Sequence, residues 1–182
     1  MARTQQDYRR IIGVDPGLNI TGYGVIDFSP AGATLCEAGI IRLPAARGRN
    51  LPARLESLFA ALREVLREFK PQTMCLEEVY SHAVYPQTAV LMGHARGVIC
   101  LAAQLEAIPV VSLSAKRIKQ SVTGNGNASK LQVQRAVKQM FMLHYTPHPP
   151  DVADALAAAL CLVNMSRLGD IAPGLAATRR PA

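Results

Sequence analysis

Short apolar runs separated by turn residues open the chain. Residues 11–15 and 20–28 form two such runs, joined by the letters DPGLN. Proline and glycine interrupt strands, and asparagine tolerates left-handed backbone, so this connection predicts a tight turn. A third run over residues 33–41 follows the letters SPAGA. Because consecutive strands usually pair with their neighbours, the pattern predicts a three-stranded antiparallel meander.

Helical and strand patterns alternate in the rest of the chain. Five leucines from Leu51 to Leu66 recur at helical spacing and predict a helix over residues 51–69, which Asn50 can cap. Short apolar runs typical of buried strands follow at residues 73–79 and 109–113. Further helices are expected over residues 86–106, 114–121, 128–142 and 151–166.

This order of elements predicts an α/β fold. Three meander strands followed by strand–helix crossovers give a five-stranded mixed sheet, a three-strand antiparallel meander plus two parallel strands, with helices on both faces. One domain should span residues 10–167. We expect a flexible basic arm over residues 1–9 and a disordered tail over residues 168–182.

An excess of basic residues narrows the choice of partner. The 182 residues hold 20 Lys and Arg against 13 Asp and Glu, a formal charge of +7. From Ala107 to Pro150 there is no acidic residue, and the basic residues of this stretch are Lys116, Arg117, Lys119, Lys130, Arg135 and Lys138. A polyanion is the partner that such a distribution favours.

Nothing in the sequence indicates export or a membrane. The first residues are polar and basic with no apolar core behind them, and no apolar run reaches the roughly 18–20 residues of a membrane span. The four cysteines are far apart in apolar surroundings and form no CxxC pair, so we expect reduced, buried thiols. These features favour a cytoplasmic protein.

Four carboxylates are the candidate chemistry. Asp15 ends the first predicted strand and Glu77 ends the fourth, and these strands should be neighbours in such a sheet. Asp151 and Asp154 are spaced i, i+3 on one face of the last helix. Four carboxylates in one place repel one another unless a cation lies between them. Oxygen ligands select Mg²⁺ or Mn²⁺, and two such ions roughly 3.5–4 Å apart support phosphodiester cleavage.

Each acid also has a simpler interpretation. Asp15 can be a solvated turn residue, and the dipole at a helix start favours Asp151 and Asp154 there without any ligand. Glu77 is harder to explain, because an unpaired carboxylate in a buried strand is costly. Adjacent strand residues point to opposite faces, so composition alone does not decide between Glu77 and Glu78.

Glycines mark two further places. Gly124 and Gly126 lie in a basic turn, where they let the backbone approach a ligand, and Asn127 can cap the helix that follows. Gly93 and Gly97 are spaced i, i+4 in an apolar predicted helix. Glycine weakens a helix, so we expect close helix contact there.

Four segments together resemble the RuvC family of crossover junction endodeoxyribonucleases, or Holliday junction resolvases. In order along the chain they read IIGVDPGLNITGYGVID, CLEEVY, RIKQSVTGNGNASK and DVADALAAAL, over roughly residues 10–165. The resemblance implies an RNase H-like fold. It also implies an endonuclease that makes paired symmetric nicks and leaves 5′-phosphate and 3′-hydroxyl ends.

The same resemblance implies the ligands and partners. Asp15, Glu77, Asp151 and Asp154 would be the catalytic carboxylates that hold two Mg²⁺ ions, with Mn²⁺ as a substitute, and Glu77 is selected over Glu78. The implied partners are four-way junction DNA, a second copy in a homodimer and the RuvA–RuvB branch-migration complex. The helix that contains the two spaced glycines would lie near the homodimer interface, and the protein would work at the nucleoid.

The resemblance also implies the contacts to DNA. Tyr80 follows the Glu77 strand and is similar to the family's aromatic residue that probes the open centre of the junction. Lys119 and Lys130 are similar to its DNA-contacting lysines, and Arg117 is a further candidate. Exposed aromatic side chains stack on unpaired bases, which is the chemistry such a residue supplies.

Three alternatives compete with a junction resolvase. The letters DPGLNITGYGVI are similar to the first phosphate loop of actin/hexokinase-type ATPases, but the chain lacks the second, duplicated domain of that architecture. An RNase H-like nuclease acting on RNA precursors is usually shorter and lacks the basic insert. A junction-binding module without catalysis would not need all four acids.

Overall fold

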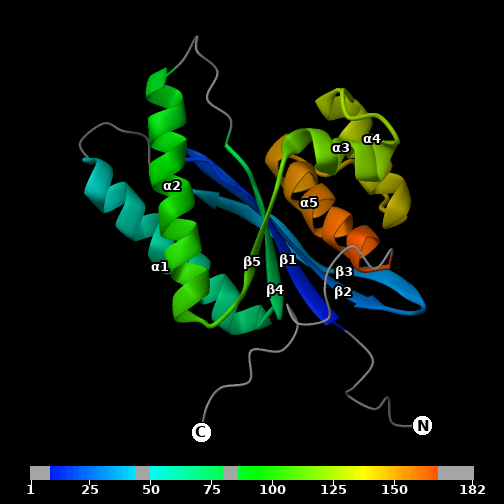
Figure 1. Cartoon of the computed structure of the whole chain (residues 1–182), viewed down its shortest axis with the longest axis horizontal. Coiled ribbons are helices and arrows are strands. Elements are labelled where there is room, and N and C mark those ends of the chain that lie inside the picture. Colours follow the sequence, from blue (N-terminus) through cyan, green and yellow to red (C-terminus); the bar gives the residue numbers. More distant parts are fainter. Residues whose placement is uncertain (1–8, 44–49, 80–85, 168–182) are drawn as a thin grey trace, which may run out of the picture.

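The computed structural model describes residues 9–43, 50–79 and 86–167. Its strands are β1 (Arg9–Asp15), β2 (Ile20–Ser29), β3 (Gly32–Arg42), β4 (Thr73–Glu77) and β5 (Val110–Leu113). Its helices are α1 (Leu51–Phe69), α2 (Pro86–Leu105), α3 (Ala115–Thr123), α4 (Lys130–Met140) and α5 (Pro150–Arg167). The strands lie in the order β3-β2-β1-β4-β5, with β1 to β3 antiparallel and β4 and β5 parallel to β1 (Figure 1). The predicted α/β fold and mixed sheet are confirmed.

Two apolar cores lie on the two faces of the sheet, because neighbouring strand residues point in opposite directions. Ile12 and Val14 of β1 join the core under α1 and α2, whereas Ile11 joins the core under α5. The α3 and α4 helices pack chiefly on α5 and form an outer layer there (Figure 1). Helices therefore cover both faces, as the order of elements predicts.

Capping residues explain where two helices begin. The Asn50 side chain accepts from the backbone N–H of Ala53 and starts α1, as expected. Before α4 the cap is Ser129, which forms a reciprocal capping box with Gln132, and not the predicted Asn127. The reason is local: the Asn125 side chain accepts from the Asn127 backbone N–H at 2.9 Å and holds this segment in a turn.

The ends of the chain and the cysteines depart from expectation in detail. Arg9 belongs to β1, where it pairs with Phe28, so the strand begins inside the expected arm. Residues 1–8 of that arm and the expected tail from residue 168 lie outside the described residues. The expectation of four buried thiols is wrong, since Cys36 is exposed on β3 and Cys100 of α2 is half-buried. An apolar neighbourhood in sequence does not bury a residue of an edge strand.

The α2 helix carries an apolar face that nothing in the described chain covers. By length and composition its residues 87–105 could cross a membrane, which corrects the expectation that no such run exists. One side of the helix packs into the core through Ala95, Ile99 and Ala102. The other side exposes Val90, Leu91, Leu101 and Leu105. Gly93 and Gly97 face open space, so the expected close contact is not made within the described part of this chain.

Glycines of β1 and β2 let the backbone of α5 lie directly on the sheet. A Cβ atom at Gly13 would stand 2.0 Å from the Ala155 carbonyl oxygen, and one at Gly22 would stand 2.1 Å from that of Asp151. Real Cβ atoms do not approach so closely, and a helix backbone cannot move aside cheaply. The small side chains of α5 complete the contact, since Ala155, Ala158 and Ala159 are fully buried.

This close contact should make Gly13 intolerant of any side chain. Gly13→Ala should lower the free energy of unfolding by at least the ~1–3 kcal/mol typical of overpacking, because the added methyl group meets rigid backbone. Gly39→Ala is the matched control in another strand, where the new Cβ meets the movable Tyr23 ring at 2.8–3.1 Å. Urea unfolding midpoints compare the two variants. Equal losses would contradict the proposed close packing.

Candidate active site

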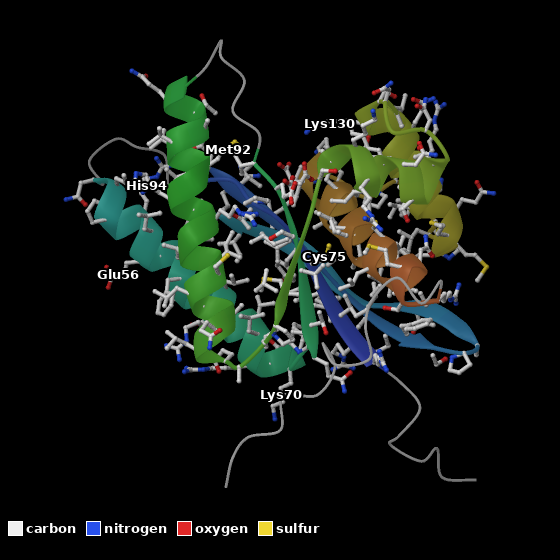
Figure 2. The ribbon with its side chains drawn as sticks, in the orientation of Figure 1. Glu56, Lys70, Cys75, Met92, His94 and Lys130 are labelled. Atoms are coloured by element: carbon white, nitrogen blue, oxygen red, sulfur yellow. The ribbon has the colours of Figure 1, made fainter. Side chains whose placement is uncertain are left out.

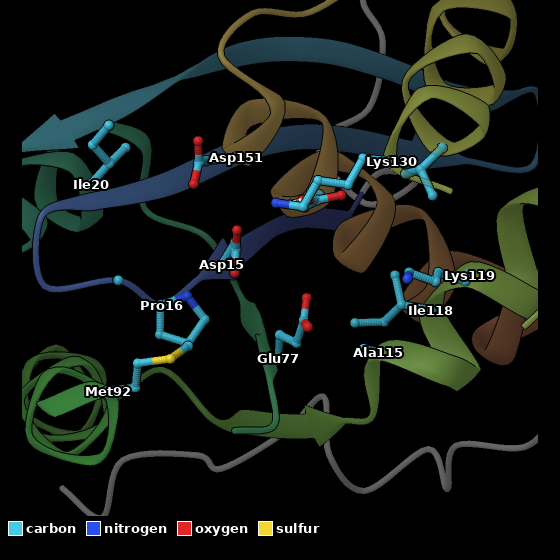
Figure 3. A pocket seen from close by; sticks show the side chains of 13 residues that line it. Asp15, Pro16, Ile20, Glu77, Met92, Ala115, Ile118, Lys119, Lys130 and Asp151 are labelled. Atoms are coloured by element: carbon cyan, nitrogen blue, oxygen red, sulfur yellow. Dashed lines mark ion pairs between the residues drawn. The ribbon is translucent and has the colours of Figure 1, made fainter. Parts of the chain in front are cut away.

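Asp15 and Glu77 lie side by side at one edge of the sheet. The β1 and β4 strands are adjacent and parallel, and their pairing ends at Val14 and Leu76. Each acid is the next residue of its strand, so the fold carries both carboxylates to the same place. Both line a pocket of about 360 Å³ (Figure 3). Glu78 is not among the residues that line it.

The other two acids reach this pocket from α5. Asp151 and Asp154 line it, as their spacing on one helix face predicts. Gly22 explains the position of Asp151, because it pairs with Asp15 in the sheet and also lies under the Asp151 backbone. The four carboxylates that the sequence singled out are therefore gathered around one pocket.

Polar side chains hold the turn that follows Asp15. The buried Thr21 hydroxyl donates to the Gly17 carbonyl oxygen at 2.6 Å and accepts from the Gly17 N–H at 3.3 Å. From α1, Arg54 donates to the Leu18 carbonyl oxygen at 2.8 Å and to the Asn19 side chain at 2.6 Å. These bonds fix a loop that an isolated Pro-Gly turn would leave free. The sequence pattern gave no sign of the part played by Arg54.

Two lysines bring positive charge to the same pocket. Lys119 of α3 and Lys130 of α4 line it, and the Lys130 Nζ lies 3.5 Å from the Asp154 Oδ2 (Figure 3). Lys130 is the first residue of its helix, where the helix dipole disfavours a cation. The carboxylates offset this cost, because they attract the ammonium group and raise the pKa of Lys130 against the opposing effect of burial.

Burial and nearby negative charge raise the pKa of three of the acids, Asp15, Glu77 and Asp154. Burial, with the negative charge of Glu77 next in importance, raises the pKa of Asp15 to about 8. Burial and the charge of Asp154 raise the pKa of Glu77 to about 7. The pKa of Asp154 is also raised by burial, although Lys130 opposes the shift. Such a cluster is poorly neutralised by the chain alone, which is the condition that favours a bound cation.

The donor set fits a hard divalent cation. All four candidate ligands are carboxylates, and oxygen donors suit Mg²⁺ or Mn²⁺ better than Zn²⁺. Among the described side chains, no three acids, thiols or imidazoles stand close enough to enclose an ion as they are placed. Ligation therefore requires the carboxylates to turn toward one another. In the metal-free chain, the Lys130 ammonium group lies 3.5 Å from Asp154 and supplies positive charge beside the carboxylates.

Apolar side chains form the wall of the pocket on its α2 side. Pro16 and Met92 lie there, whereas Ile20 lines the pocket from the start of β2. Met92 and Lys130 lie on opposite sides of the pocket (Figures 2 and 3). Sequence reasoning missed this wall. No local signal distinguishes Met92 from the other apolar residues of an apolar helix.

Of the remaining two predicted DNA contacts, Arg117 is not brought to this pocket. Arg117 lines a separate pocket of about 430 Å³ between α3 and α5, together with Asn164 and Arg167. Its neighbour in sequence, Ile118, is buried against α5. Tyr80 lies outside the described residues.

Comparison with known proteins identifies the family. The sequence pattern of the family described as crossover junction endodeoxyribonuclease RuvC matches residues 11–162. A protein of Rhodopirellula baltica with the same description is 49% identical over 153 residues, which cover 83% of this chain and 84% of the relative. A relative from Polynucleobacter asymbioticus is 40% identical over 161 residues and covers 87% of this chain and 91% of its own length.

Solved structures agree with the sequence matches. A Thermus thermophilus RuvC structure superposes with a TM-score of 0.79 at 29% identity and covers 88% of this chain and 96% of its own. A second, of T. thermophilus RuvC in complex with Holliday junction substrate, superposes with a TM-score of 0.78 at 27% identity and equal coverage. An RNA-precursor nuclease or an ATPase is not favoured by these matches. The chain belongs to the RuvC family of crossover junction endodeoxyribonucleases.

Proposed function

We propose that this protein is an endonuclease that resolves four-way DNA junctions by paired symmetric nicks. The observation that carries the proposal is one pocket that four carboxylates and two lysines line together, in a member of the RuvC family. Phosphodiester hydrolysis with a 3′-hydroxyl leaving group would leave 5′-phosphate ends. A solved relative bound to Holliday junction substrate supports this choice of DNA.

Membership of this nuclease family implies dependence on a divalent metal. We propose Mg²⁺ as the ion, two per site, with Mn²⁺ as a substitute, held by Asp15, Glu77, Asp151 and Asp154. The oxygen-only donor set supports the choice. When bound, such ions activate a water molecule and stabilise the leaving oxygen. The chain's own part is to hold the backbone of the acids at two strand ends and a helix start, so that only their side chains have to turn when ions bind.

The basic residues are proposed to hold DNA phosphates. Lys119 and Lys130 line the carboxylate pocket and would bind phosphates next to the cut. Arg117 is exposed at the second pocket and would contact backbone farther away. For Tyr80 the support is its place in the sequence, three residues after Glu77, together with the family resemblance. It would stack on unpaired bases at the junction centre.

A homodimer through α2 is the proposed assembly. Val90, Leu101 and Leu105 are 59%, 53% and 55% exposed on a helix whose other side is buried. The open space over Gly93 and Gly97 would let a second helix approach closely. A two-fold dimer matches the two-fold symmetry of a four-way junction and supplies one pocket for each of two cuts.

Family membership is the support for the remaining partners. On this ground we propose the RuvA–RuvB branch-migration complex as a partner and a cytoplasmic, nucleoid-associated place of action. The proposed nuclease domain spans residues 10–167, and β1 adds Arg9 to it.

Loss of one carboxylate should separate cutting from binding. Asp15→Asn should abolish cleavage of a labelled four-way junction, while the affinity for that junction in EDTA stays within about twofold, because binding rests on the lysines. Asp27→Asn is a matched control, since Asp27 pairs with Arg10 at 2.7 Å on the same sheet. Duplex and single-stranded DNA should remain uncut by all three proteins. Cleavage by Asp15→Asn at the wild-type rate would remove this pocket from the reaction.

Stability should depend on pH in a way that a divalent cation reverses. Because the pKa of Asp15 is about 8 and that of Glu77 about 7, the folded chain holds protons that the unfolded chain releases above about pH 4. These two groups therefore lower the free energy of unfolding as the pH rises from about 4 through about 8. Mg²⁺ binds the deprotonated acids, so its stabilising effect should grow over the same range.

Thermal melts of wild type and Asp15→Asn, in EDTA and in Mg²⁺, measure this dependence. The difference in melting temperature between the two proteins isolates the contribution of Asp15 from that of other acids. In EDTA, the melting temperature of Asp15→Asn should rise relative to that of wild type as the pH rises toward about 8. A constant difference across this range would show that Asp15 is not desolvated as described.

The assembly proposal is tested with two leucines of similar exposure. Leu101→Arg on α2 should convert the dimer to a monomer in sedimentation velocity, because it places a charge in the apolar face. Leu131→Arg on α4 is the control, since Leu131 is 51% exposed and Leu101 is 53% exposed. Loss of the dimer should turn paired cuts into single nicks. Dissociation by both variants, or by neither, would count against α2 as the interface.

A further inference from the structure

One arginine ties α2 to the end of the strand that carries Glu77. The Arg96 Nη1 donates to the Glu77 carbonyl oxygen at 2.8 Å, and its Nη2 donates to the Ser112 Oγ at 2.5 Å. Ser112 belongs to β5 and Glu77 is the last residue of β4, so a single guanidinium group joins a helix to two neighbouring strands. Arg96 is half-buried and does not line the carboxylate pocket.

The strand needs such a support at this point. The pairing of β1 with β4 ends at Val14 and Leu76, one residue before the acids. Beyond it, the β5 side holds the β4 end through the pairing of Glu77 with Leu113 and the hydrogen bond from the Glu78 N–H to the Leu113 carbonyl oxygen. On the β1 side, the register of paired residues stops at Val14 and Leu76, so Glu77 has no register partner in β1. Arg96 supplies a charge-assisted bond to the Glu77 carbonyl oxygen itself.

A comparable support holds the other strand end. Arg54 of α1 donates to the turn that follows Asp15. An arginine of α1 therefore holds the backbone after Asp15, and an arginine of α2 holds the backbone of Glu77. The planar guanidinium group can bind two acceptors at once in a fixed geometry, which a lysine cannot reproduce.

We propose that Arg96 is a positioning residue that sets the place of the Glu77 carboxylate and thereby the affinity of the pocket for divalent cations. The inference rests on the proposed function, because Glu77 is a proposed ligand there. Groups that orient metal ligands typically change metal affinity by 10–100-fold when removed. Arg96 lies on the same helix as the exposed apolar face, so the position of Glu77 also depends on how α2 is held.

The test separates positioning from folding. Arg96→Met keeps the apolar stem and removes both donors, and Arg96→Lys keeps a charge that can reach one acceptor. Arg63→Met is the matched control, since the Arg63 guanidinium joins α1 to Glu106 just after α2 at 2.7 Å, away from the pocket. Calorimetric titration of each DNA-free protein with Mn²⁺ gives metal affinity without reference to activity. Junction binding in EDTA and the Mg²⁺ dependence of cleavage complete the set.

Arg96→Met should weaken Mn²⁺ binding by about 10–100-fold and shift the Mg²⁺ requirement for cleavage in the same direction, with junction binding in EDTA unchanged. Arg96→Lys should fall between this variant and wild type, and Arg63→Met should bind Mn²⁺ like wild type. Unchanged Mn²⁺ affinity in Arg96→Met, or an equal loss in Arg63→Met, would overturn the proposal.

Two further outcomes are informative. If Arg96→Met does not fold, Ser112→Ala removes one of the two acceptors and should still weaken Mn²⁺ binding, though by less. Wild-type affinity in both Ser112→Ala and Arg96→Lys would then refute the positioning role. If wild type binds Mn²⁺ and the Arg96 variants do not, yet no protein cuts junctions, the positioning role stands and the proposed function fails.

Discussion

The backbone contact between α5 and the glycines of β1 and β2 determines where the candidate active site can form. Asp15 belongs to the sheet and Asp151 to the helix, so their separation depends on how closely these two layers approach. Gly13 and Gly22 lack the side chains that would hold the two layers farther apart. The apolar surface of α5 stabilises the fold, and the close approach of α5 to the sheet sets the separation of the carboxylates of Asp15 and Asp151.

Much of the fold and of the site follows from the sequence because the relevant signals are local or topological. The five leucines of α1 and its cap at Asn50 specify a helix whose bounds the structure reproduces at Leu51–Phe69. Turn residues specify the meander, and parallel neighbours in a sheet bring their carboxyl ends to one edge. Once β1 and β4 are adjacent, Asp15 and Glu77 must lie together. Residue spacing then suffices to add Asp151 and Asp154 from one helix face.

Other features leave no mark that a pattern can show. The apolar face of α2 looks like a core face, because hydrophobicity does not reveal whether a helix is covered by its own chain or by another. Arg54 and Arg96 each donate to a backbone carbonyl oxygen and to one neutral side chain, so no acidic residue in the sequence marks them as partners. Asn127 and Ser129 are equally good caps by residue type, and only the competing turn at Asn125 decides between them. Which of the two pockets Arg117 lines depends on the rotation of α3 about its own axis, and the sequence does not specify that rotation.

The ion pair between Lys130 and Asp154 has a consequence for the order of assembly. A tethered ammonium group competes with any free cation for the same carboxylate, so the metal-free protein carries its own weak antagonist. If a DNA phosphate takes the Lys130 ammonium, that competition is relieved, and thermodynamic reciprocity requires the cation to favour DNA in turn. Lys130 would then couple the two binding steps, so that neither the DNA nor the cation binds at full affinity until both are present. A nuclease that cuts DNA junctions gains from such a requirement, because it then binds the cation at full affinity only when DNA is present.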